Sequence, residues 1–156
     1  MANTYPDRQR TLGSLLRLPY QELQDAVYGA LASHGFADLR TAHSAVFRHL
    51  DPDGTRLTTL AERAGMTKQS MAYLVEALAS AGYLSTGPDP HDGRAKRVLL
   101  TRRGHKAVAT LIALSAEFEQ RLAERLGAGK MTRLRALLED VAAVLEADAF
   151  RNGELQ

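Results

Sequence analysis

The sequence predicts a mainly α fold of the order α-α-α-α-β-β-α-α. In this fold a winged helix-turn-helix lies between N- and C-terminal helices that form a dimerisation lobe. Three observations predict it. Two short helical patterns meet at Gly65, a turn-rich cationic segment at 87–97 separates two strand-like runs, and long apolar stripes at helical spacing occupy both ends of the chain.

The N-terminal part is expected to be two helices. Apolar residues recur at helical spacing from about residue 11 to 33. Pro19 lies inside this pattern and predicts a kink or a restart, because proline lacks the backbone N–H and clashes with the preceding turn. A second helix is expected over 38–50, followed by a turn at "DPDG", residues 51–54.

The next segment has the outline of two short helices joined by a glycine turn. Thr58 or Thr59 is expected to cap a helix that Gly65 ends. Thr67 is expected to cap a second helix that continues to about residue 81, where Gly82 follows. Two helices with so tight a connection are typical of a helix-turn-helix.

Two strands and two long helices complete the chain. Strands are expected at 83–86 and 95–100, with a helix over 101–126 and a last helix over 130–147. The last helix carries apolar residues at near-heptad spacing, namely Leu134, Leu138, Val141 and Leu145. The end helices are too long to bury their stripes against a small middle domain, which favours a homodimer over a monomeric bundle.

Composition excludes several classes of protein. The chain has 156 residues, of which 45% are hydrophobic and 24% charged, which suits one domain or a compact two-part fold. It has no Cys, which excludes disulfides, thiol sensors and Cys-based metal sites. It contains no apolar run of about 18 residues and no secretory signal, so we expect no membrane partner and a cytoplasmic protein.

Positive charge is concentrated at the hairpin. The net charge of the chain is only +2, which by itself does not indicate a nucleic-acid partner. Between Pro88 and Lys106, however, six Lys or Arg residues stand against two Asp residues. This distribution, unlike the total, is typical of a surface that meets phosphates.

The helix that starts after Thr67 has the polarity of a recognition helix. Its apolar side chains share one face, and polar side chains gather near its N-terminus. Gln contacts adenine in the major groove, Lys contacts guanine, and Ser and Thr contact bases or phosphates. The predicted DNA contacts of this helix are Thr67, Lys68, Gln69, Ser70 and Tyr73. The alternative is a capped and solvated first turn.

The hairpin is expected to act as a wing in the neighbouring minor groove. A narrow minor groove attracts an inserted Arg, and Arg94 beside Gly93 is the candidate. Asp92 is expected to hold Arg94 by an ion pair, and His91 lies near enough to contact the DNA. Lys96 and Arg97 are expected to meet phosphates, which gives affinity without sequence information. The alternative is a solvated charged turn.

These residues resemble those of a known family. The segment "LAERAGMTKQSMAYLVEALASAGYL" followed by "DPHDGRAKRVLLTRRG" resembles the MarR family of bacterial regulators. The wing pattern of the family, Asp-Pro-x-Asp-x-Arg and then Leu-Thr-x-x-Gly, is present without a gap at 89–94 and 100–104. The resemblance is strong over about 56–106 and rests only on pattern and length at the two ends.

The resemblance implies a homodimeric DNA-binding protein, usually a repressor, on a pseudo-palindromic operator. It also implies release of DNA by a small aromatic or anionic ligand. Arg17, Tyr20 and His43 are the ligand candidates, with ordinary packing or solvation as the alternative. The implied division is N-terminal dimerisation and ligand helices over 1–50, a DNA-binding lobe over 51–104, and C-terminal dimerisation helices over 105–156.

Two other classes of function would require different sequence features. A winged helix used for protein–protein interaction would present an apolar or acidic outer face on the helix 67–81, against which Lys68, Gln69 and Ser70 argue. An enzyme would need a nucleophile with a base, a phosphate loop or paired carboxylates, and no motif supplies them. We expect no metal and no cofactor, since no His pair has ligand spacing.

Overall fold

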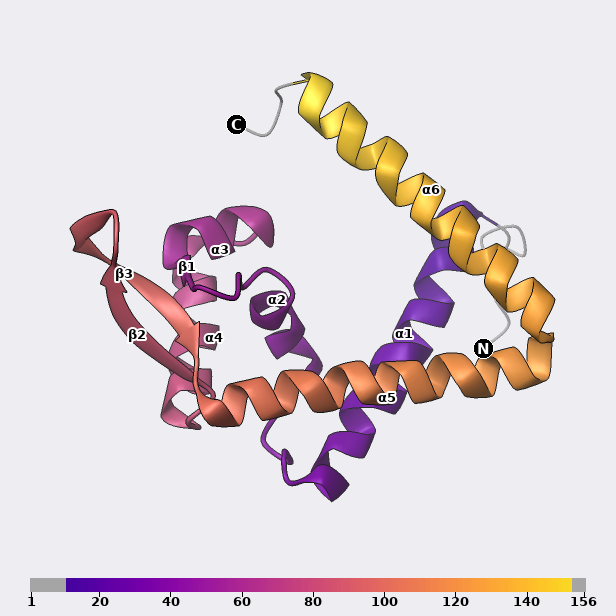
Figure 1. Cartoon of the computed structure of the whole chain (residues 1–156), viewed down its shortest axis with the longest axis horizontal. Coiled ribbons are helices and arrows are strands. Elements are labelled where there is room, and N and C mark those ends of the chain that lie inside the picture. The colour runs from indigo at the N-terminus through magenta and orange to yellow at the C-terminus, as the bar shows by residue number, and fades with distance from the viewer. Residues whose placement is uncertain (1–10, 153–156) are drawn as a thin grey trace, which may run out of the picture. The chain divides into compact units, whose positions relative to one another are not determined.

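The computed structural model describes residues 11–152, in which helices precede and follow a three-stranded antiparallel sheet (Figure 1). The chain divides into two compact units, one ending at Ser115 and one starting at Ala116. The first unit contains the helix-turn-helix, the hairpin and the start of helix α5 (Arg102–Leu126), and the second contains the rest of α5 and helix α6 (Ala128–Asn152). In the described part of the chain, no helix is long and apolar enough to cross a membrane.

The first helix is continuous where the sequence predicts a kink or a restart. Helix α1 (Leu12–Ala30) contains Pro19 and does not restart there. A helix tolerates the missing N–H of one proline when that part of its surface faces water, and Pro19 is exposed. The 3-10 helix η2 (Leu31–His34) follows and ends at Gly35, whose φ of 85° is in the left-handed region.

The second helix is shorter than the expected 38–50. The chain forms the 3-10 helix η3 (Thr41–His43) and then helix α2 (Ser44–Phe47). Leu39 is buried at 3% exposure, and Arg40 has extended backbone angles, φ −129° and ψ 158°. The helical residues therefore begin after Leu39, whose side chain packs into the core.

The helix-turn-helix consists of α3 (Leu57–Arg63) and α4 (Lys68–Ser80). The expected cap of α3 at Thr58 or Thr59 is wrong, since the N-cap is Arg56 and makes no side-chain capping bond. The expected cap of α4 is confirmed. The Thr67 hydroxyl accepts the backbone N–H of Ser70 at 3.1 Å. Gly65 joins the two helices with a φ of 61°, a conformation that favours glycine.

The hairpin is longer than predicted and has a third partner. Strands β2 (Leu84–Asp89) and β3 (Asp92–Leu100) pair antiparallel, which leaves only residues 90 and 91 in the turn. Strand β1 (Thr55–Arg56), which was not predicted, pairs with the other side of β3. The sheet order is thus β1-β3-β2, and the base of the wing is joined to the start of α3.

One apolar core holds the first unit together. Its fully buried members come from several elements and include Leu31, Val46, Leu60, Met71, Leu78 and Tyr83. Helix α5 (Arg102–Leu126) contributes Ala107 and Leu114 to this core. Burial of apolar surface stabilises a fold by about 25 cal/mol per Å². This core is therefore the main source of stability for the helix-turn-helix.

Helix α6 (Ala128–Asn152) belongs to the second unit and begins two residues before the prediction. Arg135 on α6 pairs with Glu119 at 2.9 Å and with Glu139 at 3.1 Å. Its predicted apolar residues remain exposed, with Val141 at 50% and Leu145 at 63%. A face of this kind is normally covered by another protein surface.

Candidate nucleic-acid interface

The N-terminal turn of α4 presents polar side chains to solvent. Met71, Leu74, Val75 and Leu78 are buried on one face of the helix, and this orients the opposite face outward. Lys68, Gln69 and Ser70 are exposed at its N-terminus, and Tyr73 is 74% exposed one turn later. The five residues predicted from the sequence therefore lie at one end of one helix, as a major-groove helix requires.

The wing presents cations on β3 close to its turn. Arg94 and Lys96 are exposed on this strand, and His91 is exposed in the turn itself. The Asp92 carboxylate accepts the backbone N–H of Arg94 at 3.1 Å, which fixes the backbone and leaves the guanidinium unrestrained. Among residues 11–147, no ion pair involves the Arg94 side chain.

The expected ion pair between Asp92 and Arg94 is therefore replaced by another one. The Asp92 carboxylate lies 3.7 Å from the Arg56 guanidinium, at the start of α3. Pairing of β1 with β3 places Arg56 beside the wing, and the sequence pattern does not indicate this pairing because β1 has only two residues. Asp92 thus acts on the Arg94 backbone and on Arg56.

Arg97 differs from the other wing cations. Its side chain is only 16% exposed and pairs with Asp89 at 3.2 Å and with Asp53 at 3.2 Å. Its guanidinium is thereby occupied by two carboxylates, so it is less suited to a phosphate than Lys96. The sequence pattern does not indicate the role of Asp89, a buried carboxylate whose pKa is lowered mainly by the Arg56 hydrogen bond and then by the His91 backbone N–H.

The three ligand candidates make separate contacts. Arg17 donates to the Gln21 side chain at 2.8 Å on the exposed surface of α1. Tyr20 accepts a hydrogen bond from Arg48, whose guanidinium lies 5.7 Å from the centroid of the tyrosine ring. His43 Nδ1 accepts the backbone N–H of Arg40 at 3.0 Å, and burial lowers the pKa of the imidazole.

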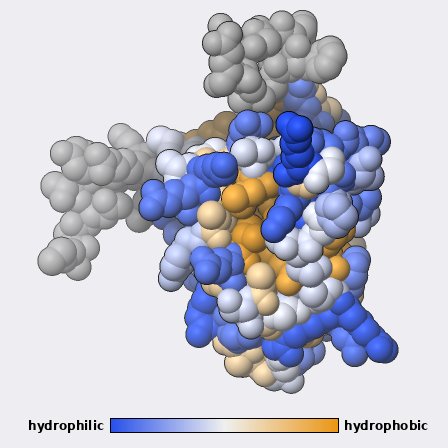
Figure 2. Space-filling model, turned by 90° about the vertical axis from the view of Figure 1, so that its left-hand side faces the viewer, coloured by the Kyte–Doolittle hydropathy of each residue, from blue (hydrophilic) through white to orange (hydrophobic). Residues whose placement is uncertain are grey.

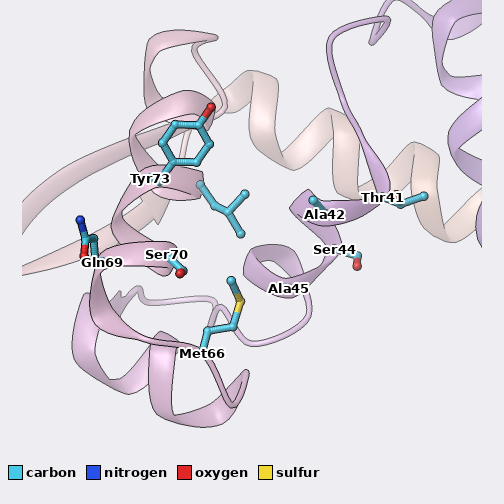
Figure 3. A pocket seen from close by; sticks show the side chains of 9 residues that line it. Thr41, Ala42, Ser44, Ala45, Met66, Gln69, Ser70 and Tyr73 are labelled. Carbon is cyan, nitrogen blue, oxygen red and sulfur yellow. The ribbon is translucent and has the colours of Figure 1, made fainter.

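Two cavities lie against the segment 41–45. The smaller, of about 410 Å³, is lined by Tyr20, Gln24, Asp25 and neighbouring residues of α1 together with Thr41, Ala42 and Ser44. The larger, of about 680 Å³, lies between η3, α2 and α4. Figure 3 shows Met66 and Tyr73 on the α4 side of this groove and Ala42 and Ala45 on the other side.

The larger cavity shares residues with the predicted DNA surface. Gln69, Ser70 and Tyr73 line it, and its lining contains no charged side chain. Figure 2, which views the molecule from the hairpin side of Figure 1, shows a hydrophobic area bordered by hydrophilic residues.

In the part of the chain that the structure describes, no group of three His, Cys, Asp or Glu residues is placed to hold a metal.

Part of the chain matches a known protein family. Residues 37–95, which contain α2, α3, α4 and β2, match the profile of the MarR family. Over this segment the chain is similar to the MarR family. No curated protein matches the chain.

Solved structures share the MarR fold. The repressor CouR bound to a 23-mer DNA duplex has a TM-score of 0.66 at 21% identity, covering 91% of this chain and 99% of CouR. CouR from Rhodococcus jostii bound to p-coumaroyl-CoA has a TM-score of 0.63 at 23% identity, covering 84% and 91%. A transcriptional regulator from Thermotoga maritima has a TM-score of 0.63 at 23% identity, covering 87% and 94%.

Proposed function

We propose that this chain is a homodimeric repressor of the MarR family that binds a pseudo-palindromic operator in the cytoplasm. Helix α4 enters the major groove of each half-site, and the wing places Arg94 in the adjacent minor groove. The observation that carries the proposal is the unpaired and exposed Arg94 on β3, next to a backbone fixed by Asp92. An extended cation of this kind suits the negative potential of a narrow minor groove.

The proposed DNA contacts are of two kinds, contacts to base edges and contacts to the phosphate backbone. Gln69 and Lys68 carry donors suited to base edges, and Thr67 and Ser70 lie at the N-terminus of α4, where free backbone amides favour a phosphate. Lys96 and His91 meet the backbone beside the wing. The dimer places two copies of α4 about one DNA turn apart, roughly 34–36 Å, so that both half-sites are used.

A small aromatic or anionic ligand releases the DNA. The groove between α2 and α4 suits an uncharged aromatic group, because apolar side chains line it and Gln69, Ser70 and Tyr73 border it. An anionic group would meet cations at the α1 end, where Arg48 donates to Tyr20 and Arg17 lies on the same helix as that tyrosine. CouR, which is bound to an aromatic CoA ester in its crystal structure, supports the aromatic class. A ligand can release the DNA only to the extent that it binds one spacing of the two recognition helices more tightly than the other.

Fluorescence anisotropy with the intergenic DNA upstream of the protein's own gene tests the proposal. The wild type is expected to bind this duplex more tightly than a scrambled duplex, and Arg94→Ala is expected to weaken that preference about tenfold. Arg121→Ala, which removes an exposed cation from the second unit, is the matched control and is expected to bind like the wild type.

Equal binding of both duplexes by all three proteins would contradict sequence-specific recognition by the wing. Absence of binding at low salt would instead favour the winged helix as a protein-interaction module.

A further inference from the structure

A buried carboxylate lies in the wing beside its two-residue turn, in contact with two of the predicted DNA-contacting residues, Arg97 and His91. The side chain of Asp89, the last residue of β2, is 1% exposed. Its Oδ2 accepts from Arg56 Nε at 2.6 Å and from Arg97 Nε at 3.2 Å, and its Oδ1 accepts the His91 backbone N–H at 2.8 Å. Burial of a carboxylate is costly unless it is paired and hydrogen-bonded in this way.

The sheet explains why a carboxylate is needed there. Arg56 on β1 and Arg97 on β3 are directly opposite each other in the antiparallel pairing. Like charges in such positions destabilise a sheet. The pairing of β2 with β3 shifts register between Pro88 and Asp89, and a shift of this kind re-aims the side chain that follows it. Asp89 thereby reaches both guanidinium groups.

The same arginines hold two further carboxylates. Arg97 pairs with Asp53 before β1, and Arg56 lies 3.7 Å from Asp92. We call Asp53, Arg56, Asp89, Asp92 and Arg97 the wing-base cluster. With three carboxylates and two guanidinium groups, its formal charge is −1. The cluster as a whole therefore does not attract DNA phosphates.

The wing-base cluster connects the two parts of the DNA-binding surface. Arg56 is the N-cap residue of α3, and α3 packs on α4. From Arg56, one contact leads to Asp92, and Asp92 holds the backbone N–H of Arg94. Two polar contacts therefore join the start of the helix-turn-helix to the residue proposed for the minor groove.

We infer that Asp89 is a positioning residue for minor-groove recognition, and that Arg97 acts through Asp89 and not on a phosphate. The wing-base cluster fixes the hairpin against β1 and α3, and this sets where Arg94 lies relative to α4. The inference rests on the proposed function, since it assumes that Arg94 contacts DNA. Positioning of this kind changes selectivity without changing the number of phosphate contacts.

A double-mutant cycle tests the role of Asp89. The variants are Asp89→Asn, which keeps the shape and removes the charge, Arg94→Ala, and the double variant. Asp89→Asn is expected to lower the preference for operator over scrambled DNA about tenfold, and Arg94→Ala to lower it further by less than about twofold in that background. Independent, multiplicative effects of the two substitutions would overturn the inference.

The Arg97→Lys variant distinguishes a positioning role of Arg97 from a phosphate contact. It also replaces Asp89→Asn as the test if that variant fails to fold. Lysine keeps the charge but has no Nε–H at the place where Arg97 meets Asp89. We expect Arg97→Lys to lose selectivity like Asp89→Asn, with the salt slope of binding to scrambled DNA unchanged. Lys96→Ala, in contrast, is expected to reduce that slope by about 1. Wild-type selectivity in Arg97→Lys, or a reduced slope, would overturn the inference.

Two controls make the outcome specific. Glu62→Gln removes an exposed carboxylate of α3 that lies outside the wing-base cluster, and it is expected to leave selectivity within about twofold of the wild type. Thermal unfolding of each variant establishes that the compared proteins are folded. If Arg94→Ala alone leaves selectivity unchanged, the proposed function of the wing fails, which is a result distinct from failure of the cycle.

Discussion

At the scale of single residues, Gly104 lies where the first turn of α5 passes the backbone of Tyr83. A Cβ at this position would overlap the Tyr83 carbonyl oxygen and would lie 2.9 Å from Leu100 Cδ2. The backbone of Gly104 is held there by Thr101, whose hydroxyl accepts the Gly104 N–H at 3.1 Å and donates to the Gly82 carbonyl at 2.6 Å. The Leu-Thr-x-x-Gly pattern therefore has a packing reason at this position.

Gly104→Ala is expected to lower the free energy of unfolding by about 1–3 kcal/mol, because the added methyl group forces two elements apart. Chemical denaturation measures the change. Gly29→Ala is the matched control, since no atom lies within 4 Å of an added Cβ in α1, and it is expected to be neutral or slightly stabilising. Equal effects of the two substitutions would contradict the packing reason.

His43 is expected to make stability depend on pH. Its Nδ1 accepts the Arg40 N–H, and burial, followed by the charge of Arg40, lowers its pKa in the folded state. The unfolded chain binds the proton more readily, with a pKa of about 6.5. The stability contributed by the neutral ring is fully present above that pH and is lost as the pH falls toward the folded pKa.

The measurement compares wild type and His43→Gln by denaturant unfolding between pH 5 and 8. The stability of the wild type relative to His43→Gln is expected to fall as the pH drops below about 6.5. Because other titrating groups are shared by both proteins, their contributions cancel in the difference. A constant difference across this range would contradict the assignment.

At the scale of elements, the cap of α4 stabilises the start of the recognition helix. Thr67→Ala removes the hydroxyl that accepts the Ser70 N–H and is expected to cost about 1 kcal/mol of stability. Thr67→Ser retains an acceptor and is expected to lose only a few tenths of that. Thermal unfolding and DNA binding of the two variants give the comparison, and equal losses in both would argue against capping as the role of Thr67.

The elements also show what a sequence pattern can and cannot predict. The boundaries of α4 follow from Thr67 and Gly82, since a cap and a left-handed glycine are local signals. The two-residue strand β1 has no pattern of its own, and it exists because β3 offers a free edge. The start of α2 depends on burial of Leu39, which is a tertiary constraint.

The wing-base cluster depends still more on tertiary structure. The sequence shows that the wing cations are near one another, but it does not distinguish the role of Arg97 from that of Lys96. Asp53 and Arg56 come from one segment and Asp89 from another, and only the sheet brings these two segments together. The difference between a cation held by carboxylates and one open to solvent is therefore visible only in the fold.

At the scale of the whole molecule, apolar surface is exposed on helices at both ends of the chain. On α1, Leu12 is 71% and Leu18 is 58% exposed, and on α6 Val144 is 60% exposed. Exposed apolar stripes of this length favour association with a second copy. The same stripes were the basis for predicting a dimer from the sequence.

Val141→Glu, within the stripe of α6, is expected to abolish the proposed dimer and to weaken operator binding. Sedimentation velocity measures the association state. Ala143→Glu is the matched control, because it adds the same charge to the same helix about half a turn away. Retention of the dimer in Val141→Glu would contradict the role of this stripe, and so would its loss in both variants.

The central claim is that α4 and the wing contact adjacent grooves of one operator, with Arg94 in the minor groove. Hydroxyl-radical footprinting of the upstream duplex with wild type and Arg94→Ala tests it most directly, at protein concentrations that saturate both complexes. We expect the wild type to protect two half-sites about one turn apart, and Arg94→Ala to lose only the protection of the flanking minor grooves. Identical footprints for the two proteins would contradict the claim.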